Sequence, residues 1–443
     1  MWVQRASHSR ATTTREAVTW RRSAAASLVT AVLLAACGGN GQGEPTVRGS
    51  VAGDTFDAQI VSALSEDEAA DLAASINAFG FDLHRSLLID ADHAGDNVVT
   101  APASVAVLLA MVAAGADGET ASQMADVLHV ATVRDNRFAT LLDQIVDTDA
   151  VTLEIANSLW VDQKYELLDD YLAWVREAFT ATVEPAHLDE QSGADAIDAW
   201  VRQNTEDRID GIAEELGLPD PDMAEVLANA VYFLGNWTTQ FDPDQTRDAP
   251  FRLSDGTVVQ VPTMHRSALK EGDVFGVATM DDHRAIRLSY GDDQRFGMEI
   301  FIPDGDRDLT DFISSFDQST WAAAVAALHP AGGFELSMPS FELTWGDKLG
   351  DVLKAMGMPL AFAPEGADFS RMSNTPLFLS TVVHKTYIRV DEQGTEAAAV
   401  TGGGMMPTSA PPSIEVDRPF AFTISDRDTG TILFLGTVED PRG

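Results

Sequence analysis

The order of helical and strand-like patterns along the chain restricts its fold most strongly. Apolar residues recur at helical spacing in residues 66–88, 103–114, 120–128 and 194–216, mostly in the first half. Strand-like runs of β-branched and aromatic residues lie mainly in the second half, at 153–161, 298–302, 334–338, 382–390, 420–424 and 432–438. Because these patterns do not alternate in βαβ order, they predict an α+β fold with predominantly antiparallel sheets rather than a doubly wound parallel sheet.

The chain is long enough to bury a large core. It has 443 residues, of which 45% are hydrophobic. After about residue 66 no second linker and no internal repeat is visible, so we expect one large domain over residues 66–443.

The charge is strongly unbalanced. The 29 Lys and Arg residues against 69 Asp and Glu residues give a net charge of −40. Such a field repels phosphate backbones and sulfated chains, so neither nucleic acid nor a heparin-like polyanion is an expected partner. We interpret the acidity as solubility of an exposed, monomeric protein.

The N-terminus has the features of a targeting segment. Arg21 and Arg22 precede a short apolar run, 23–36, that ends at Cys37, the one cysteine of the chain. The run is too short to span a bilayer, and its end, Leu34-Ala35-Ala36-Cys37, resembles the lipobox of bacterial lipoproteins. We therefore predict a signal peptide over residues 1–36 and a flexible tether over 37–65.

The resemblance to a lipobox implies lipidation of Cys37 and an exported protein anchored at the cell envelope, on the outer membrane or the cell surface. The alternative is an ordinary secreted, extracellular protein in which the cysteine is incidental. With a single cysteine, neither an intramolecular disulfide nor a cysteine-based zinc site is possible.

Motifs of catalysis are largely missing from the sequence. It contains no GxSxG, HExxH, P-loop or GxGxxG, and its nine histidines form no pair at i,i+4 spacing on a helix. Ser267-Ala-Leu-Lys270 fits the SxxK of penicillin-recognising enzymes, but no KTG or SDN accompanies it. We predict that the protein is not an enzyme and needs no metal or cofactor.

One uncharged segment is unusual in so acidic a chain. Residues 397–414 carry no charge, begin with small side chains and end rich in proline. Composition alone favours a low-complexity loop. Small neutral residues after the strand-like run 382–390 are also suited to extend that strand into a neighbouring gap.

The residues before this segment, Asp391-Glu-Gln-Gly-Thr-Glu-Ala-Ala-Ala399, closely resemble the hinge of inhibitory serpins. The resemblance extends from about residue 68 to the C-terminus, with its parts in family order. The similar segments are Asn97–Ser104, Leu153–Trp160, Asn229–Trp237, Arg418–Phe422 and Thr429–Gly436.

This resemblance implies a serpin fold with a large central sheet A and a suicide inhibitor of serine proteases. The exposed loop, about residues 392–414, is the bait, and the protease nucleophile forms an acyl-enzyme with it. The loop then inserts into sheet A and traps the covalent complex. The family's hinge corresponds here to Glu392, Gly394, Thr395, Glu396, Ala397, Ala398 and Ala399.

Family spacing, counted from Gly394 and back from Pro419, places the bait bond at Thr408–Ser409. A small β-branched residue suits a shallow pocket, so we expect an elastase-like or subtilisin-like target rather than a trypsin-like one. Loop length varies in the family, and Met405 or Met406 stays an alternative bait residue.

The resemblance also implies control residues. Ser104, Asn229 and His384 match a buried polar cluster beneath the opening of sheet A, and Trp237 matches an aromatic residue at its top. The chain departs from the family where Ala101 replaces a serine and Leu234 a lysine. Ser340 stands where many members have a lysine that pairs with Glu392. A non-inhibitory serpin that is cleaved without trapping its protease stays the alternative.

Overall fold

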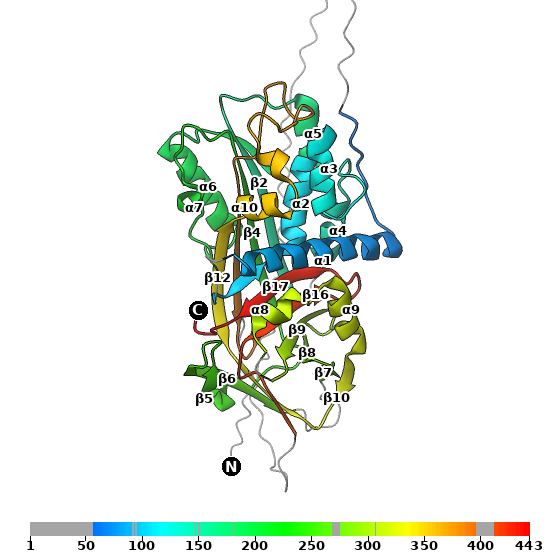
Figure 1. The fold of residues 1–443 in the computed structure, drawn as a ribbon, viewed down its shortest axis with the longest axis vertical. Coiled ribbons are helices and arrows are strands. Elements are labelled where there is room, and N and C mark those ends of the chain that lie inside the picture. The colour runs from blue at the N-terminus through cyan, green and yellow to red at the C-terminus, as the bar shows by residue number, and fades with distance from the viewer. Residues whose placement is uncertain are drawn as a thin grey trace, which may run out of the picture. The chain divides into compact units, whose positions relative to one another are not determined.

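The computed structural model describes residues 56–90, 93, 95–146, 148, 151–179, 181–267, 275–305, 307–395 and 412–443. These residues belong to one compact unit, Asp54–Gly443 (Figure 1). Several predicted sites lie outside the described residues: Cys37, Lys270, Glu396, Ala397, Ala398, Ala399, Thr408 and Ser409.

Three sheets organise the unit. The sheet that we call sheet A has the order β12 (Phe341–Lys348), β13 (Thr381–Val390), β4 (Glu225–Asn236), β2 (Thr152–Asp162) and β3 (Thr182–Ala186), and β14 (Gly394–Thr395) pairs with β4. A seven-stranded sheet has the order β1 (Val98–Thr100), β17 (Ile432–Val438), β16 (Phe420–Asp426), β9 (Phe296–Pro303), β8 (His283–Ser289), β7 (Phe275–Thr279) and β10 (His329–Ala331). The third sheet has the order β15 (Ser413–Glu415), β11 (Glu335–Pro339), β6 (Val258–Ser267) and β5 (Arg247–Arg252).

Most strand pairs are antiparallel. Among the described strands, the parallel pairs are β13 with β4, β2 with β3, and β11 with β15. The predicted α+β fold with predominantly antiparallel sheets is therefore confirmed.

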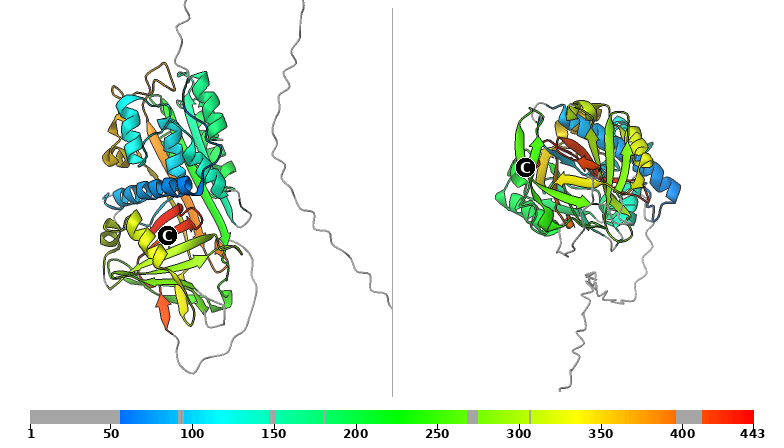
Figure 2. Two further views of the ribbon diagram at one scale, coloured as in Figure 1. Left: turned by 90° about the vertical axis from the view of Figure 1, so that its right-hand side faces the viewer. Right: turned by 90° about the horizontal axis from the view of Figure 1, so that it is seen from below.

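Ten α-helices pack around these sheets in the described part of the chain (Figures 1 and 2). They are α1 (Glu66–Leu88), α2 (Pro102–Ala113), α3 (Gly118–Val127), α4 (Arg137–Val146), α5 (Asp169–Ala178), α6 (Gln191–Asn204), α7 (Ala213–Leu216), α8 (Leu309–Ser314), α9 (Gln318–Ala327) and α10 (Gly350–Met356). No helix of these described segments is both long enough and apolar enough to cross a membrane.

The first helix begins where the sequence predicts it. Ser65 and Glu68 form a reciprocal capping box, and three acidic residues in the first turn favour the positive end of the helix dipole. The helix packs against α2, all of whose residues are buried. This complete burial explains the apolar run that follows Pro102, because α2 contacts β2 and β4 of sheet A as well as β17.

The compact unit includes more of the N-terminal region than α1. Residues 56–65, the last part of the predicted tether, pack on the domain: the Gln59 N–H donates to the Arg134 carbonyl, and the Val61 N–H to the Asn136 amide oxygen. Phe56 lies against Tyr171 and Trp174.

The helical pattern predicted over residues 194–216 is divided in the structure. Helix α6 ends at Asn204, and Glu206 and Asp207 then adopt left-handed backbone angles, with φ of 48° and 60°. The Asp198 carboxylate accepts the N–H groups of Ile212 and Ala213. Apolar residues of this connection still pack on sheet A, which explains why the sequence keeps a periodic appearance beyond α6.

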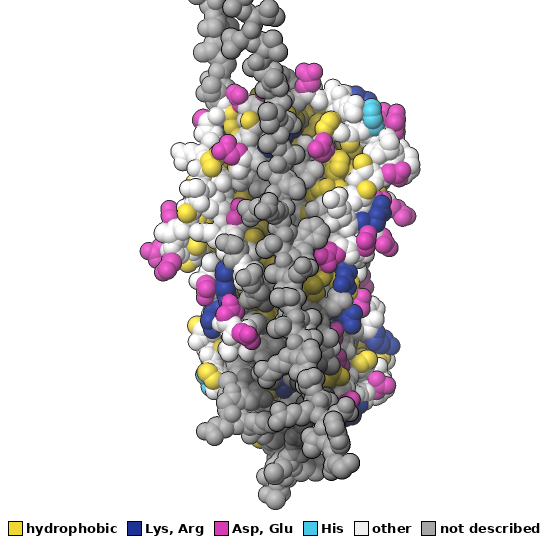
Figure 3. All heavy atoms as spheres, turned by 180° about the vertical axis from the view of Figure 1, so that it is seen from behind, with side chains coloured by type: hydrophobic (Ala, Val, Ile, Leu, Met, Phe, Trp, Pro, Cys, Tyr) yellow, Lys and Arg dark blue, Asp and Glu magenta, His cyan; other side chains and the backbone are white. Residues whose placement is uncertain are grey.

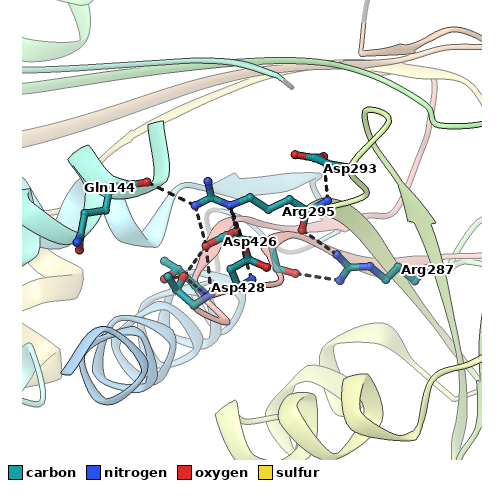
Figure 4. A network of polar contacts seen from close by, with 9 residues as sticks. Gln144, Arg287, Asp293, Arg295, Asp426 and Asp428 are labelled. Atoms are coloured by element: carbon teal, nitrogen blue, oxygen red, sulfur yellow. Dashed lines mark hydrogen bonds and ion pairs between the residues drawn. The ribbon is translucent and has the colours of Figure 1, made fainter. Parts of the chain in front are cut away.

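The seven-stranded sheet contains a buried polar network (Figure 4). The Arg295 guanidinium lies 2.6 Å from the Asp426 carboxylate, which is fully buried, and Arg287 pairs with the buried Glu299. Thr423 and Ser425 also donate to Glu299. Every member has a partner, which is the condition under which buried charge is tolerated.

On the face seen in Figure 3, Asp and Glu side chains lie on both sides of the atoms drawn in grey, with Lys and Arg side chains among them.

Candidate functional site: the seam of sheet A and the hinge

The centre of sheet A is a parallel strand pair. Residues 226–232 of β4 lie opposite residues 381–387 of β13, and we call this pairing the seam. The outer neighbours, β2 beside β4 and β12 beside β13, are antiparallel. A strand entering between β4 and β13 would run antiparallel to both, so the topology leaves room for one further strand with standard pairing on each side.

A buried polar cluster crosses the middle of the seam. His384 of β13 lies directly opposite Asn229 of β4, and its Nδ1 is 2.7 Å from the Asn229 amide oxygen. The Asn229 amide nitrogen donates to the Ser104 hydroxyl of α2, and also to the Asn157 amide oxygen of β2 at 2.8 Å. The structure thus brings together the predicted Ser104, Asn229 and His384. It adds Asn157, which the sequence did not predict as a member of the cluster.

His384 is neutral in this cluster. Burial lowers the pKa of His384 to about 3, because the charged imidazolium loses its hydration. Its Nε2 accepts the backbone N–H of Ala101 at 2.9 Å, which leaves Nδ1 as the donor to Asn229. Ala101, where the family usually has a serine, therefore still contributes a hydrogen bond through its main chain.

Trp237 lies beyond the hinge-side end of the seam. Its ring stacks on Tyr290 with centroids 4.4 Å apart, and its indole N–H donates to the Asp391 carbonyl at 2.9 Å. The backbone N–H of Trp237 donates to the Gln393 carbonyl at the same distance. Trp237, the aromatic residue predicted at the top of sheet A, thus holds the chain that leads into the hinge.

The hinge already forms the start of an additional strand. Gly394 and Thr395 pair antiparallel with Asn236 and Gly235 of β4. Gly394 has a φ of +140°, and a Cβ there would lie 2.1 Å from the Gly235 carbonyl oxygen. Only glycine fits this position, because an added side chain would collide with the β4 backbone.

Glu392 is held by hydrogen bonds. Its carboxylate accepts from the Thr246 hydroxyl at 2.5 Å, and its carbonyl accepts the Phe241 N–H at 2.8 Å. Ser340 donates instead to the Pro262 carbonyl. The hinge of this chain is thus fixed without the Lys–Glu ion pair that many serpins have. The contact of Glu392 with Thr246 could not be predicted from local sequence.

Other candidate chemistry has less structural support. Ser267 ends β6 at an exposed position, while its SxxK partner lies outside the described residues. Among the described residues, His187, Asp189 and Glu190 form one exposed group of possible metal ligands, with ligand atoms within 4.8 Å of one another. The Lys164 ammonium group lies 3.1 Å from Asp189 and competes with any cation there.

Known proteins share this arrangement. The sequence model of the family described as "Serpin (serine protease inhibitor)" matches residues 74–441. An uncharacterized serpin-like protein of Thermococcus kodakarensis is 34% identical over 86% of this chain and 88% of its own length. A leukocyte elastase inhibitor of Xenopus tropicalis is 31% identical over 84% of this chain and 100% of its own.

A solved structure agrees with these sequence relatives. The thermophilic serpin tengpin, in its native state, superposes with a TM-score of 0.76 at 26% identity, covering 87% of this chain and 97% of tengpin. The chain thus has the fold of a serpin, with the hinge paired beside the parallel seam. The chain belongs to the serpin family, whose members are typically inhibitors without enzymatic activity.

Burial of a neutral His384 makes the stability of the protein depend on pH. Below its ordinary pKa of 6.5 the imidazole binds a proton in the unfolded chain but not in the folded protein. The free energy of unfolding therefore falls as pH decreases from about 6.5 to about 3, by about 1.4 kcal/mol per pH unit for this residue. The H384Q variant has an amide that can donate and accept hydrogen bonds but does not titrate. Its free energy of unfolding, measured with denaturant, should therefore decrease by about 1.4 kcal/mol less per pH unit over this range. Equal slopes for both proteins would contradict a neutral buried His384.

Proposed function

We propose that the protein is a suicide inhibitor of serine proteases, with Thr408–Ser409 as its bait bond. The observation that carries the proposal is the pairing of Gly394 and Thr395 with β4, next to the parallel seam. The hinge thereby has the direction and the position of a strand that could continue into the seam.

Continuing the register of β14 gives the partners of the loop residues. Thr395 lies opposite Gly235, so Ala397, Ala399 and Thr401 would lie opposite Phe233, Val231 and Asn229. These three β4 residues are buried in the main core or bonded to Ser104 of α2. The small, uncharged residues of the loop would therefore face the tightly packed side, and the charged Glu396 would face the opposite side, beside the half-buried Leu234.

The trapping step follows from the acyl chemistry. The hydroxyl of the protease attacks the Thr408 carbonyl, the bond to Ser409 breaks, and the new amine leaves with the C-terminal fragment. Insertion of residues 395–408 spans about 45 Å at the usual rise per residue. That displacement carries the ester-linked protease along sheet A before water can hydrolyse the ester.

The target class rests on the bait residue. Thr408 is small and β-branched, and the loop segment 397–414 has no Lys or Arg for a trypsin-like pocket. The relative named leukocyte elastase inhibitor supports an elastase-like target, and a subtilisin-like protease fits the same side chain.

The direct test is covalent complex formation. We expect the chain from Gly38 onward, which keeps the whole compact unit, to form a boiling-resistant adduct with elastase or subtilisin but not with trypsin. Sequencing of the released fragment should begin at Ser409. Cleavage without an adduct would instead favour a non-inhibitory serpin that acts as a protease substrate or binding module.

A pair of neighbouring variants tests the direction of the loop side chains. A397R places a charge on the packed side, so insertion should stall and the protein should be cleaved as a substrate, with adduct yield reduced at least about tenfold. E396R also introduces an arginine, but on the opposite side, and should keep most of its adduct yield. Equal loss in both variants on denaturing gels would contradict the extended register.

We further propose that the protein is exported and lipid-anchored through Cys37. The support is the sequence Leu34-Ala35-Ala36-Cys37 after a short apolar run. In an expressing cell, the full-length chain should partition with the membrane fraction, and mass spectrometry should find acyl chains on an N-terminal Cys37. The C37A variant should lose both properties; an unmodified mature chain beginning elsewhere would refute the anchor and favour simple secretion.

A further inference from the structure

A cation lies over the seam on the outer face of sheet A. The guanidinium carbon of Arg208 is 5.6 Å from the ring centroid of Tyr232 and 5.8 Å from that of Tyr387. Tyr232 belongs to β4 and Tyr387 to β13, and the two residues lie directly opposite each other. They form the last pair of the seam on the side of the hinge, so Arg208 bridges the two strands where an entering loop would first part them.

The connection between α6 and α7 positions Arg208 firmly. Glu206 and Asp207, immediately before it, both have positive φ, a conformation that costs energy for residues with a Cβ. Ile209 and Ile212, just after it, are buried against sheet A. The unusual backbone turn is therefore fixed from its C-terminal side, and its consequence is to direct Arg208 toward the two rings.

A second contact ties the same connection to β13. The Lys385 ammonium group donates to the Gly211 carbonyl at 2.9 Å and to the Glu215 carboxylate at 2.5 Å. Helix α6 contacts β2 and β3, and α7 contacts β12 and β13. Lys385 fastens only one strand of the seam, however, whereas Arg208 contacts both.

Separation of the strands is incompatible with both ring contacts. Neighbouring strands lie about 4.8 Å apart, so an additional strand would place β4 and β13 about 9.6 Å apart. The guanidinium group of Arg208, which contacts both rings in the closed sheet, would then lose its contact with one of them. The hydrogen bond between His384 and Asn229 must break as well, but it lies further along the seam, at the position opposite Thr401 in the extended register.

We propose that Arg208, Tyr232 and Tyr387 form a clasp whose release controls the rate at which the loop enters sheet A, with Arg208 as the positioning residue. The proposal rests on the proposed function, since it concerns the insertion step of that mechanism. A guanidinium group suits a position over two aromatic rings better than an ammonium group, because the ammonium group of lysine is compact and strongly hydrated.

The test measures opening of the sheet without any protease. An acetylated peptide with the sequence of residues 395–408 is incubated with the chain from Gly38 onward, and its uptake is followed by the rise in thermal stability. R208Q should take up the peptide about three to thirty times faster than the unaltered protein. R208K should lie in between, because it keeps the positive charge and loses the guanidinium group.

Two controls separate the clasp from general destabilisation. R134Q also removes an arginine, but Arg134 lies away from the seam, where its guanidinium group is 2.6 Å from the Asp117 carboxylate. This variant should take up the peptide at the original rate. The double variant R208Q/Y387L should be no faster than the faster of its two single variants, since each substitution breaks the same clasp. Multiplicative acceleration, or equal acceleration by R134Q, would overturn the proposal.

The outcome also distinguishes the clasp from the proposed function. If the unaltered protein forms protease adducts while R208Q and R208K take up peptide at the original rate, the proposal of a clasp is refuted and the proposal of inhibition is supported. If the unaltered protein takes up no peptide and forms no adduct, the insertion mechanism fails and the clasp fails with it.

Discussion

The parallel pairing of β4 with β13 is the constraint on which the rest of the structure depends. Antiparallel neighbours flank it on both sides, so the centre of sheet A can accept one more strand without a change of direction elsewhere. The hydrogen bonds between β4 and β13 are each worth only about 1 kcal/mol net. In the proposed mechanism, a new strand would replace that one row with two, so other contacts would have to keep the sheet closed before insertion.

Those contacts lie on both faces of the seam and at its end. On the inner face, His384, Asn229 and Ser104 connect β13, β4 and α2 through neutral groups. On the outer face, Arg208 lies over one ring from each strand. Beyond the end, Trp237 holds the chain before the hinge through the Asp391 carbonyl. If the loop inserts as proposed, each contact would resist separation of the strands at a different position along the seam.

Hydrogen bonds take the place of family side chains at two positions. Glu392 accepts from a threonine hydroxyl, and the main chain of Ala101 supplies the donor where many serpins have a serine. Where the chain departs from the family pattern, other groups therefore supply hydrogen bonds to His384 and to Glu392.

The sequence alone determined the α+β class and the bounds of α1, because periodicity and caps are local signals. Its resemblance to serpins also pointed to Ser104, Asn229 and His384 of the inner cluster, but not to Asn157. The sequence failed over residues 194–216, where buried apolar residues imitate one long helix, although Asp198 and two left-handed residues divide it. Thr246 beside Glu392 and Arg208 over two tyrosines were decided only by tertiary structure. These residues are far apart in the chain, and no local pattern records which side chains the strand register and the helix connections bring together.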